Sequence, residues 1–235
     1  MTARFYTRNG ANRSETMAGG VDVSLIEDML QFIGVFVSFS IAYVAFRGLK
    51  QTRSPALLRL ATAFLFLGVG FMVQAVLGLD GVVTVLPALT TTAVAGLVVA
   101  SALMETAGYF FLAFSHALDV MFSRRLKVSL LLFPVFTLSA AQTTDALSIL
   151  SFYFILYGVL ETITAYARNR KPDTLLIALG LALLGAGTFV AWLSLMYPVV
   201  YVLSLVQIII KEVGLMILFI PVLSYALGGK ANGPI

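Results

Sequence analysis

Residues Leu175–Leu227 read LLIALGLALLGAGTFVAWLSLMYPVVYVLSLVQIIIKEVGLMILFIPVLSYAL. The only charged residues in this stretch are Lys211 and Glu212. A transmembrane helix needs about 20 apolar residues, so the stretch is too long for a single crossing. We divide it at Tyr197-Pro198, because proline cannot continue the hydrogen-bond ladder of a helix. A double apolar block of this length predicts an all-α integral membrane protein.

The composition of the whole chain supports this class. The 235 residues are 60% hydrophobic and only 11% charged, and the mean hydropathy is +1.00. A soluble domain carries roughly a quarter charged residues, so water is not the solvent for most of this surface. The chain has no cysteine, which excludes disulfides, thiolate metal sites and cysteine nucleophiles.

Five further apolar stretches precede the double block, and together they predict a bundle of seven transmembrane helices. The fourth span is the shortest and contains Pro134. Residues 1–22 would form a flexible polar tail, 23–227 the membrane domain and 228–235 a short second tail, and either Met1 or Met17 could be the start. The predicted spans are Val23–Phe46, Pro55–Leu79, Thr91–Leu118, Leu126–Ala140, Ala146–Ala167, Thr174–Leu195 and Val199–Leu227.

The orientation follows from the basic residues, which gather in alternate breaks between the spans. Lys and Arg are enriched in cytoplasmic loops, whereas Asp80 and Asp145 mark the other breaks. We therefore predict a multi-pass protein of the cell membrane with its N-terminus outside and its C-terminus in the cytoplasm. Topology accounts for the basic clusters, so no nucleic-acid partner is expected. Most of the 15 Lys and Arg residues lie on the predicted cytoplasmic side, namely Arg47, Lys50, Arg53, Arg59, Arg124, Arg125, Lys127, Arg168, Arg170, Lys171 and Lys230.

The chain contains the trace of an internal repeat. Aligning Pro55 with Pro172 brings LGVG at Leu67–Gly70 onto LGAG at Leu184–Gly187, and one helix later Glu105 falls opposite Lys211. Spans one to three would then match spans five to seven, with span four as the linker of a 3+1+3 parallel repeat. Parallel-repeat transporters bind their substrates near the midplane between the halves. Chance is the alternative, because small residues recur in membrane helices wherever backbones approach closely.

Four charged residues lie inside predicted spans: Glu105, Glu161, Lys211 and Glu212. A charge at this depth costs at least ~2.5–3.5 kcal/mol, so it needs a partner or a function. With a rise of about 1.5 Å per residue, Glu105 and Lys211 both come close to the bilayer centre. We predict that they form an ion pair inside the bundle, since pairing offsets desolvation. Glu212 is turned away from Lys211 toward a neighbouring helix.

Polar residues at helical spacing predict the lining of this site. Tyr109 lies four residues after Glu105, and Gln207 lies four residues before Lys211, so each shares a face with its charged neighbour. Tyr157 and Glu161 form a similar pair on the fifth span. The path of a solute or ion would run past these groups. In the alternative interpretation the ion pair only fixes the packing of the helices.

Several chemistries are disfavoured. The chain has one histidine and no cysteine, which is too few ligands for a zinc site or a bis-histidine haem. We therefore expect no metal. The chain has neither a phosphate-binding glycine loop nor a nucleophile elbow, so we expect no enzymatic activity. The leading prediction is a small solute, ion or proton transporter. An accessory subunit of a membrane complex, with a membrane partner or as a homo-oligomer, is an alternative.

A lysine in the last of seven helices, with a carboxylate on helix three, resembles the arrangement in microbial rhodopsins. The resemblance implies that Lys211 would carry retinal as a Schiff base with Glu105 as its counter-ion, in a photosensor or receptor. The chain departs from that family in having Gln207 where an Asp is usual, and in having Trp192 as its only tryptophan. The 3+1+3 layout also resembles that of SWEET-type sugar transporters, although neither half contains their Pro-Gln pair.

Overall fold

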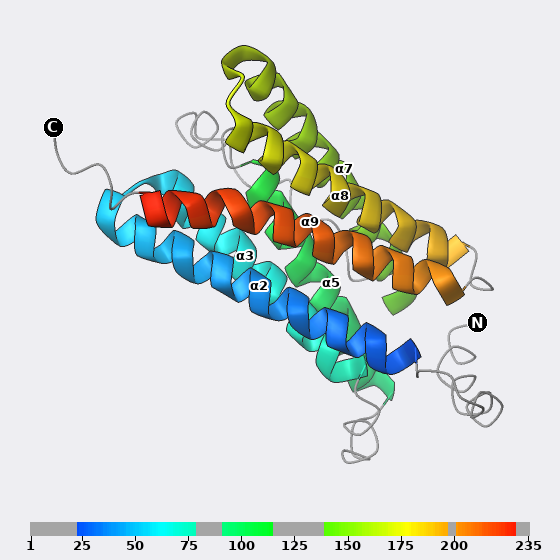
Figure 1. Ribbon diagram of the computed structural model, residues 1–235. Coiled ribbons are helices and arrows are strands. Elements are labelled where there is room, and N and C mark those ends of the chain that lie inside the picture. Colours follow the sequence, from blue (N-terminus) through cyan, green and yellow to red (C-terminus); the bar gives the residue numbers. More distant parts are fainter. Residues whose placement is uncertain (1–22, 79–90, 115–138, 197–200, 229–235) are drawn as a thin grey trace, which may run out of the picture.

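The computed structural model of the protein describes residues 23–78, 91–114, 139–196 and 201–228, and in these ranges the chain is all-α (Figure 1). All six described helices are long and apolar enough to cross a membrane, which makes the chain a multi-pass helical membrane protein in contact with lipid. The helices are α2 (Val23–Thr52), α3 (Pro55–Gly78), α5 (Thr91–Ala113), α7 (Ala140–Asn169), α8 (Pro172–Met196) and α9 (Tyr201–Gly228).

Six of the predicted spans correspond to these helices, but some helices extend beyond the apolar residues. The clearest case is α7, which begins at Ala140 rather than Ala146. Ser139 caps it by accepting a hydrogen bond from the Gln142 N–H, and the Gln142 side chain accepts one from the Ser139 N–H in return. The fourth predicted span lies outside the described residues except for its last two, as do residues 1–22 and 229–235 of the predicted tails.

The six helices form a ring in which each packs mainly against two neighbours, in the order α2, α3, α5, α7, α8, α9 and back to α2. The contacts of α2 with α3, α3 with α5, α7 with α8 and α8 with α9 are antiparallel. Two contacts are different, because α5 and α7 run parallel, and so do α9 and α2. We call these contacts the α5–α7 seam and the α2–α9 seam.

The direction of each seam follows from pairs of contacts. In the α5–α7 seam, Thr106 contacts Ser151, and seven residues further along both helices Ala113 faces Gly158. In the α2–α9 seam, Ser204 contacts Glu27, and the next contact joins Glu212 to Gly34. Helices α2, α5, α7 and α9 therefore begin at the same end of the bundle. The start of α2 and the end of α9 lie at opposite ends (Figure 1).

The turns from α2 to α3 and from α7 to α8 have the same local structure. Arg53 and Arg170 both adopt left-handed backbone conformations, with φ of 52° and 49°. Each donates its N–H to a carbonyl four residues earlier, at 2.8 Å and 2.7 Å respectively. A proline follows two residues later as the first residue of the next helix, where its missing N–H costs nothing. The two turns coincide when Pro55 is aligned with Pro172.

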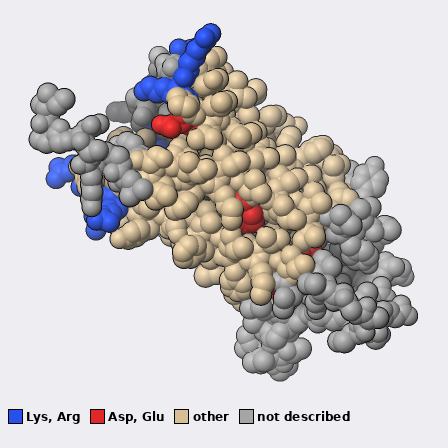
Figure 2. Space-filling view, in the orientation of Figure 1, with Lys and Arg blue, Asp and Glu red and all other residues tan. Residues whose placement is uncertain are grey.

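The surface of the described helices is apolar over most of their length. Large hydrophobic side chains such as Phe36, which is 75% exposed, point outward, as a lipid-facing surface requires. Figure 2 shows this apolar face, with Lys and Arg gathered toward one end of the bundle. The core inside the ring includes Ile41, Phe64, Leu67, Phe71, Tyr109, Ile155, Leu184 and Leu215.

Candidate functional site

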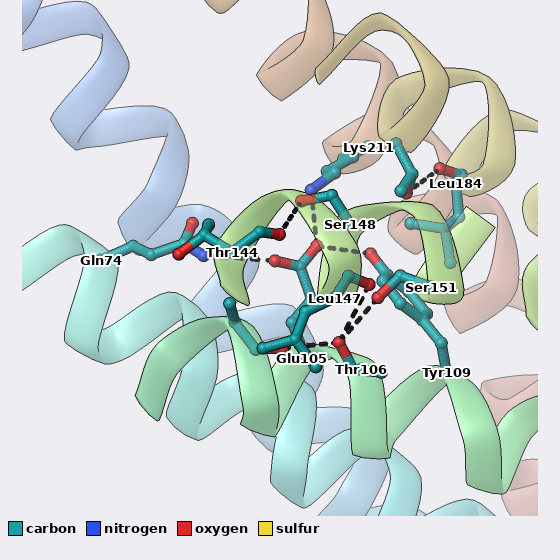
Figure 3. Close-up of polar contacts among 12 residues, drawn as sticks. Gln74, Glu105, Thr106, Tyr109, Thr144, Leu147, Ser148, Ser151, Leu184 and Lys211 are labelled. Atoms are coloured by element: carbon teal, nitrogen blue, oxygen red, sulfur yellow. Dashed lines mark hydrogen bonds and ion pairs between the residues drawn. The ribbon is translucent and has the colours of Figure 1, made fainter. Parts of the chain in front are cut away.

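The centre of the ring contains a carboxylate with three hydrogen-bond donors. The Lys211 Nζ lies 2.5 Å from Glu105 Oε1, and the Tyr109 hydroxyl donates to the same oxygen at 2.8 Å. Gln74 Nε2 donates to Oε2 at 3.2 Å. Figure 3 shows these side chains converging from α3, α5 and α9. The predicted pair between Glu105 and Lys211 is therefore formed in the structure.

Burial makes this arrangement strong. Glu105 is only 8% exposed, and Tyr109 is fully buried. Hydrogen bonds to an ionised group are roughly twice as strong as neutral ones, and three of them satisfy a carboxylate that water cannot reach. Removal of any one donor would leave part of this charge without compensation.

Two glycines allow the helices carrying the pair to approach their neighbours. A Cβ at Gly70 of α3 would lie 3.3 Å from the backbone nitrogen of Glu105. A Cβ at Gly187 of α8 would lie 3.2 Å from the backbone nitrogen of Lys211. Both distances are tighter than an ordinary side chain tolerates, so these positions favour glycine, as is usual where membrane helices meet closely. The acid and the lysine are thus held by the same kind of contact.

A second set of glycine contacts shows the same correspondence. A Cβ at Gly108 of α5 would lie 2.9 Å from the carbonyl oxygen of Ala63 on α3. A Cβ at Gly214 of α9 would lie 2.9 Å from the carbonyl oxygen of Gly180 on α8. These four positions are also paired by the alignment of Pro55 with Pro172 and of Glu105 with Lys211. The α3–α5 and α8–α9 pairs are therefore packed alike.

The lysine has few partners of its own. Within the described residues its ammonium makes one hydrogen bond, to Glu105, although it has three N–H donors. One turn earlier, the side-chain oxygen of Gln207 is buried without a hydrogen-bond partner. Gln207 and Lys211 lie four residues apart within α9 and so share a face of that helix. Gln207 does not bond to the pair in this structure.

Glu212 points into the α2–α9 seam. It therefore faces a neighbouring helix rather than the ion pair, as its position next to Lys211 in the sequence predicts. It is 4% exposed, and a Cβ at Gly34 of α2 would overlap its carboxylate. Its Oε2 atom has no hydrogen-bond partner in the described structure. Four residues after Gly34, the fully buried hydroxyl of Ser38 also lacks one.

The structure does not place Tyr157 and Glu161 with the central pair. Tyr157 is 43% exposed, and its ring stacks on Phe114 with 5.1 Å between ring centroids. The buried side of α7 instead carries Ser151 and Ile155, and Tyr157 lies two residues from Ile155, on the opposite face of the helix. Glu161 is half-buried one turn beyond Tyr157.

Some residues of the site escaped the sequence analysis. Gln74 is one amide in a long apolar helix, and nothing in its neighbourhood indicates a partner on α5. The buried Thr106 hydroxyl lies 2.8 Å from the Ser151 hydroxyl across the α5–α7 seam. Hydroxyl residues are common in membrane helices, so these two gave no signal by themselves. In the described ranges, no three His, Asp or Glu side chains are grouped as a metal site would need.

No protein-family model, curated protein or solved structure matches this chain. The geometry of the chain itself is therefore the basis for assigning a function.

Proposed function

We propose that the protein is a small, non-enzymatic transporter that moves a solute or an ion together with protons. The observation that carries this proposal is the buried ion pair between Glu105 and Lys211. Each half of the ring, α2–α3–α5 and α7–α8–α9, contributes one member of the pair. A charged contact between two halves is suited to transport because it can break when the halves move apart.

The two halves would be the units of a 3+1+3 parallel repeat. The matching turns at Arg53 and Arg170 support this, as do the matching glycine contacts of the α3–α5 and α8–α9 pairs. In such a repeat Glu105 and Lys211 occupy equivalent positions on either side of a two-fold axis along the membrane normal. Transporters built from parallel repeats bind their substrates at this place.

The parallel direction of α5 and α7 supports a seventh crossing. Because both helices begin at the same end, Ala113 at the end of α5 and Ala140 at the start of α7 lie at opposite ends of the bundle. The predicted fourth span, Leu126–Ala140, would supply this crossing. We further propose that the end bearing Arg47, Lys50, Arg168 and Lys171 faces the cytoplasm, which puts the N-terminus outside a cell membrane.

Proton binding would control the pair. A proton on Glu105 removes the negative charge that holds Lys211, and the lysine then becomes free to bind an anionic group of a solute or to turn away. Loss of the contact shifts the equilibrium between arrangements of the two halves. Tyr109 and Gln74 hold the carboxylate in place throughout, because their hydrogen bonds come from the same half as Glu105.

Proton flux tests the proposal. The purified protein would be reconstituted into liposomes containing a trapped pH-sensitive dye, and flux would be driven by a potassium diffusion potential. We expect flux above that of empty liposomes, and loss of this excess in Glu105→Gln. Glu161→Gln, which changes a glutamate outside the pair, should keep it. Flux in Glu105→Gln equal to that of the unchanged protein would contradict the proposal.

The same pair also favours one other candidate, a retinal protein. A lysine amine against a buried carboxylate is the arrangement that a protonated Schiff base and its counter-ion need. A visible absorption band in protein purified mildly from its native membrane, lost in Lys211→Ala, would favour a photosensor over a transporter. Recovery of stoichiometric partner proteins in mild detergent would favour an accessory subunit instead.

A further inference from the structure

The α2–α9 seam contains a second acidic site that the central ion pair does not explain. Glu212 follows Lys211 directly in the chain, but its side chain points away from the pair to the backbone of α2 at Gly34. A larger residue at this position of α2 would overlap the carboxylate. The glycine therefore makes room for the acid, and the seam is shaped around it.

Charge at this depth is balanced only if Glu212 is neutral. The ammonium of Lys211 is bonded to Glu105, and together these two groups carry no net charge. Glu212 Oε2 has no donor within the described residues. An ionised carboxylate without donors is among the most costly groups to bury in a membrane, whereas a protonated one is tolerated.

Near Glu212, the described parts of the neighbouring helices offer no other cation, because Arg47 and Lys50 lie at the far end of α2. On α2 the ionisable groups on its side of the bundle are Glu27 and Asp28, which are both acidic. On α8 the only charged residue is Asp173, in the first turn, at the opposite end from the start of α9. On α5, the charge of Glu105 is balanced by Lys211. The charged side chains on the Glu212 side of α2 are therefore both acidic, and they disfavour its ionisation.

Polar groups connect this acid to the end of the bundle where α2 and α9 begin. Ser204 donates a 2.5 Å hydrogen bond to Glu27 at that end. Gln207, with its buried and unpartnered oxygen, comes one turn deeper on the inner face of α9, and Glu212 follows at the level of Gly34, while Ser38 lies one turn beyond it on α2. Buried polar groups of this kind are commonly joined by ordered water, which conducts protons.

We propose that Glu212 is a proton-binding site that holds a proton at neutral pH and exchanges it along the α2–α9 seam. The site adds a carboxyl group to the transporter proposed above and gives the proton a place distinct from the ion pair. The bound proton is a property of the folded bundle alone. It can therefore be tested whether or not the transport proposal holds.

Infrared spectroscopy of the reconstituted protein at pH 7 tests occupancy directly, because a protonated carboxyl group has a carbonyl stretch that a carboxylate lacks. We expect this band in the unchanged protein and its loss in Glu212→Gln. The matched controls Glu27→Gln and Glu161→Gln should keep it. Absence of the band from the unchanged protein, or its survival in Glu212→Gln, would overturn the proposal.

A second variant tests the assignment even if Glu212→Gln fails to fold. Gly34→Ala forces the carboxyl group to move while leaving it in the protein, so the frequency of the band should shift. An unshifted band would place the protonated group elsewhere and overturn the assignment. These results are independent of flux in Glu105→Gln, so failure of this site and failure of the transport proposal are distinguishable.

The route of exchange has its own measurement. On transfer to heavy water the band shifts as deuterium replaces the proton, and the rate of this shift reports access. Ser204→Ala and Gln207→Leu should slow it severalfold, whereas Thr106→Val in the α5–α7 seam should leave the rate unchanged. A rate unaffected by Ser204→Ala and Gln207→Leu would exclude the α2–α9 seam as the route.

Discussion

The two seams of the ring have the same parallel packing but opposite chemistry. In the α5–α7 seam, the Thr106 hydroxyl lies 2.8 Å from the Ser151 hydroxyl and 3.3 Å from the carbonyl of Leu147. In the α2–α9 seam, Ser204 bonds to Glu27 near the helix starts, but deeper along the helices Glu212 and Ser38 bury oxygens without partners in the described structure. Thr106 and Glu212 directly follow the two residues of the ion pair, so they hold equivalent positions in the proposed repeat.

This difference indicates which seam is able to open. A buried polar contact that is fully satisfied holds two helices together, while one that is only partly satisfied costs little to separate. We therefore expect the two halves to pivot about the α5–α7 seam and to part at the α2–α9 seam. Four sets of variants test this view.

The largest effect should come from removing the lysine that joins the two halves. Lys211→Met leaves Glu105 buried without its cation, and loss of one partner from a buried pair typically costs about 3–5 kcal/mol. Unfolding in mixed detergent micelles measures this, with the exposed Lys171→Met as a control. The double variant Glu105→Gln/Lys211→Met should recover most of the loss. A cost no larger than that of Lys171→Met would show that the pair does not join the halves.

Next in size is the loss of a hydrogen bond to the central carboxylate. Tyr109→Phe removes a donor from Glu105, and a hydrogen bond to a charged group contributes about 1.5–3 kcal/mol. Tyr157→Phe changes an exposed ring on the outer face of α7 and should stay within about 0.5 kcal/mol. The same unfolding measurement compares the two. An equal loss of stability in the two variants would mean that Tyr157 belongs to the central site, as its spacing predicts.

The glycine contacts test whether the two halves are truly alike. Gly108→Ala and Gly214→Ala each push a Cβ against a backbone carbonyl 2.9 Å away, and overpacking of this kind costs about 1–3 kcal/mol. The two costs should be similar. Gly96→Ala, which meets nothing within 4 Å, should be neutral or stabilising by up to about 1 kcal/mol. A large cost at only one of the first two positions would argue against equivalent packing.

The smallest effect separates the seams themselves. Thr106→Val keeps the shape of the side chain but removes the Thr106 hydroxyl that bonds to Ser151. The expected cost in stability is about 1 kcal/mol. Ser38→Ala removes a hydroxyl that has no partner, so stability should be unchanged or slightly higher. Thermal unfolding in detergent would resolve the sign of each change. The reverse order would mean that the α2–α9 seam is the tighter one.

The fold was predictable from sequence because hydrocarbon imposes a simple rule on length and polarity. Apolar length located six described helices, and a count of residues inward placed Glu105 and Lys211 at one depth. The start of α7 was harder to predict, because its first turn is polar and is stabilised by the cap at Ser139 rather than by contact with lipid.

The faces of the helices were harder to predict than their lengths. Spacing showed that Tyr157 and Glu161 share a face of α7, but a helix that is apolar on all sides does not reveal which face points inward. Contacts between distant helices, such as Gln74 with Glu105, depend on the order of helices around the ring. The alternation of charged breaks along the chain carries no information about that order.

The arginines at the two matching turns have a consequence for biosynthesis. Glycine adopts a left-handed conformation easily, whereas other residues incur a cost of about 1–2 kcal/mol there. Arg53→Gly and Arg170→Gly should therefore ease the finished turns. The same changes would remove positive charge beside helix ends, where the insertion machinery sets the orientation of a nascent chain. Under the proposed orientation, each turn retains a small permanent strain together with a signal that is needed only once, while the chain is being inserted into the bilayer.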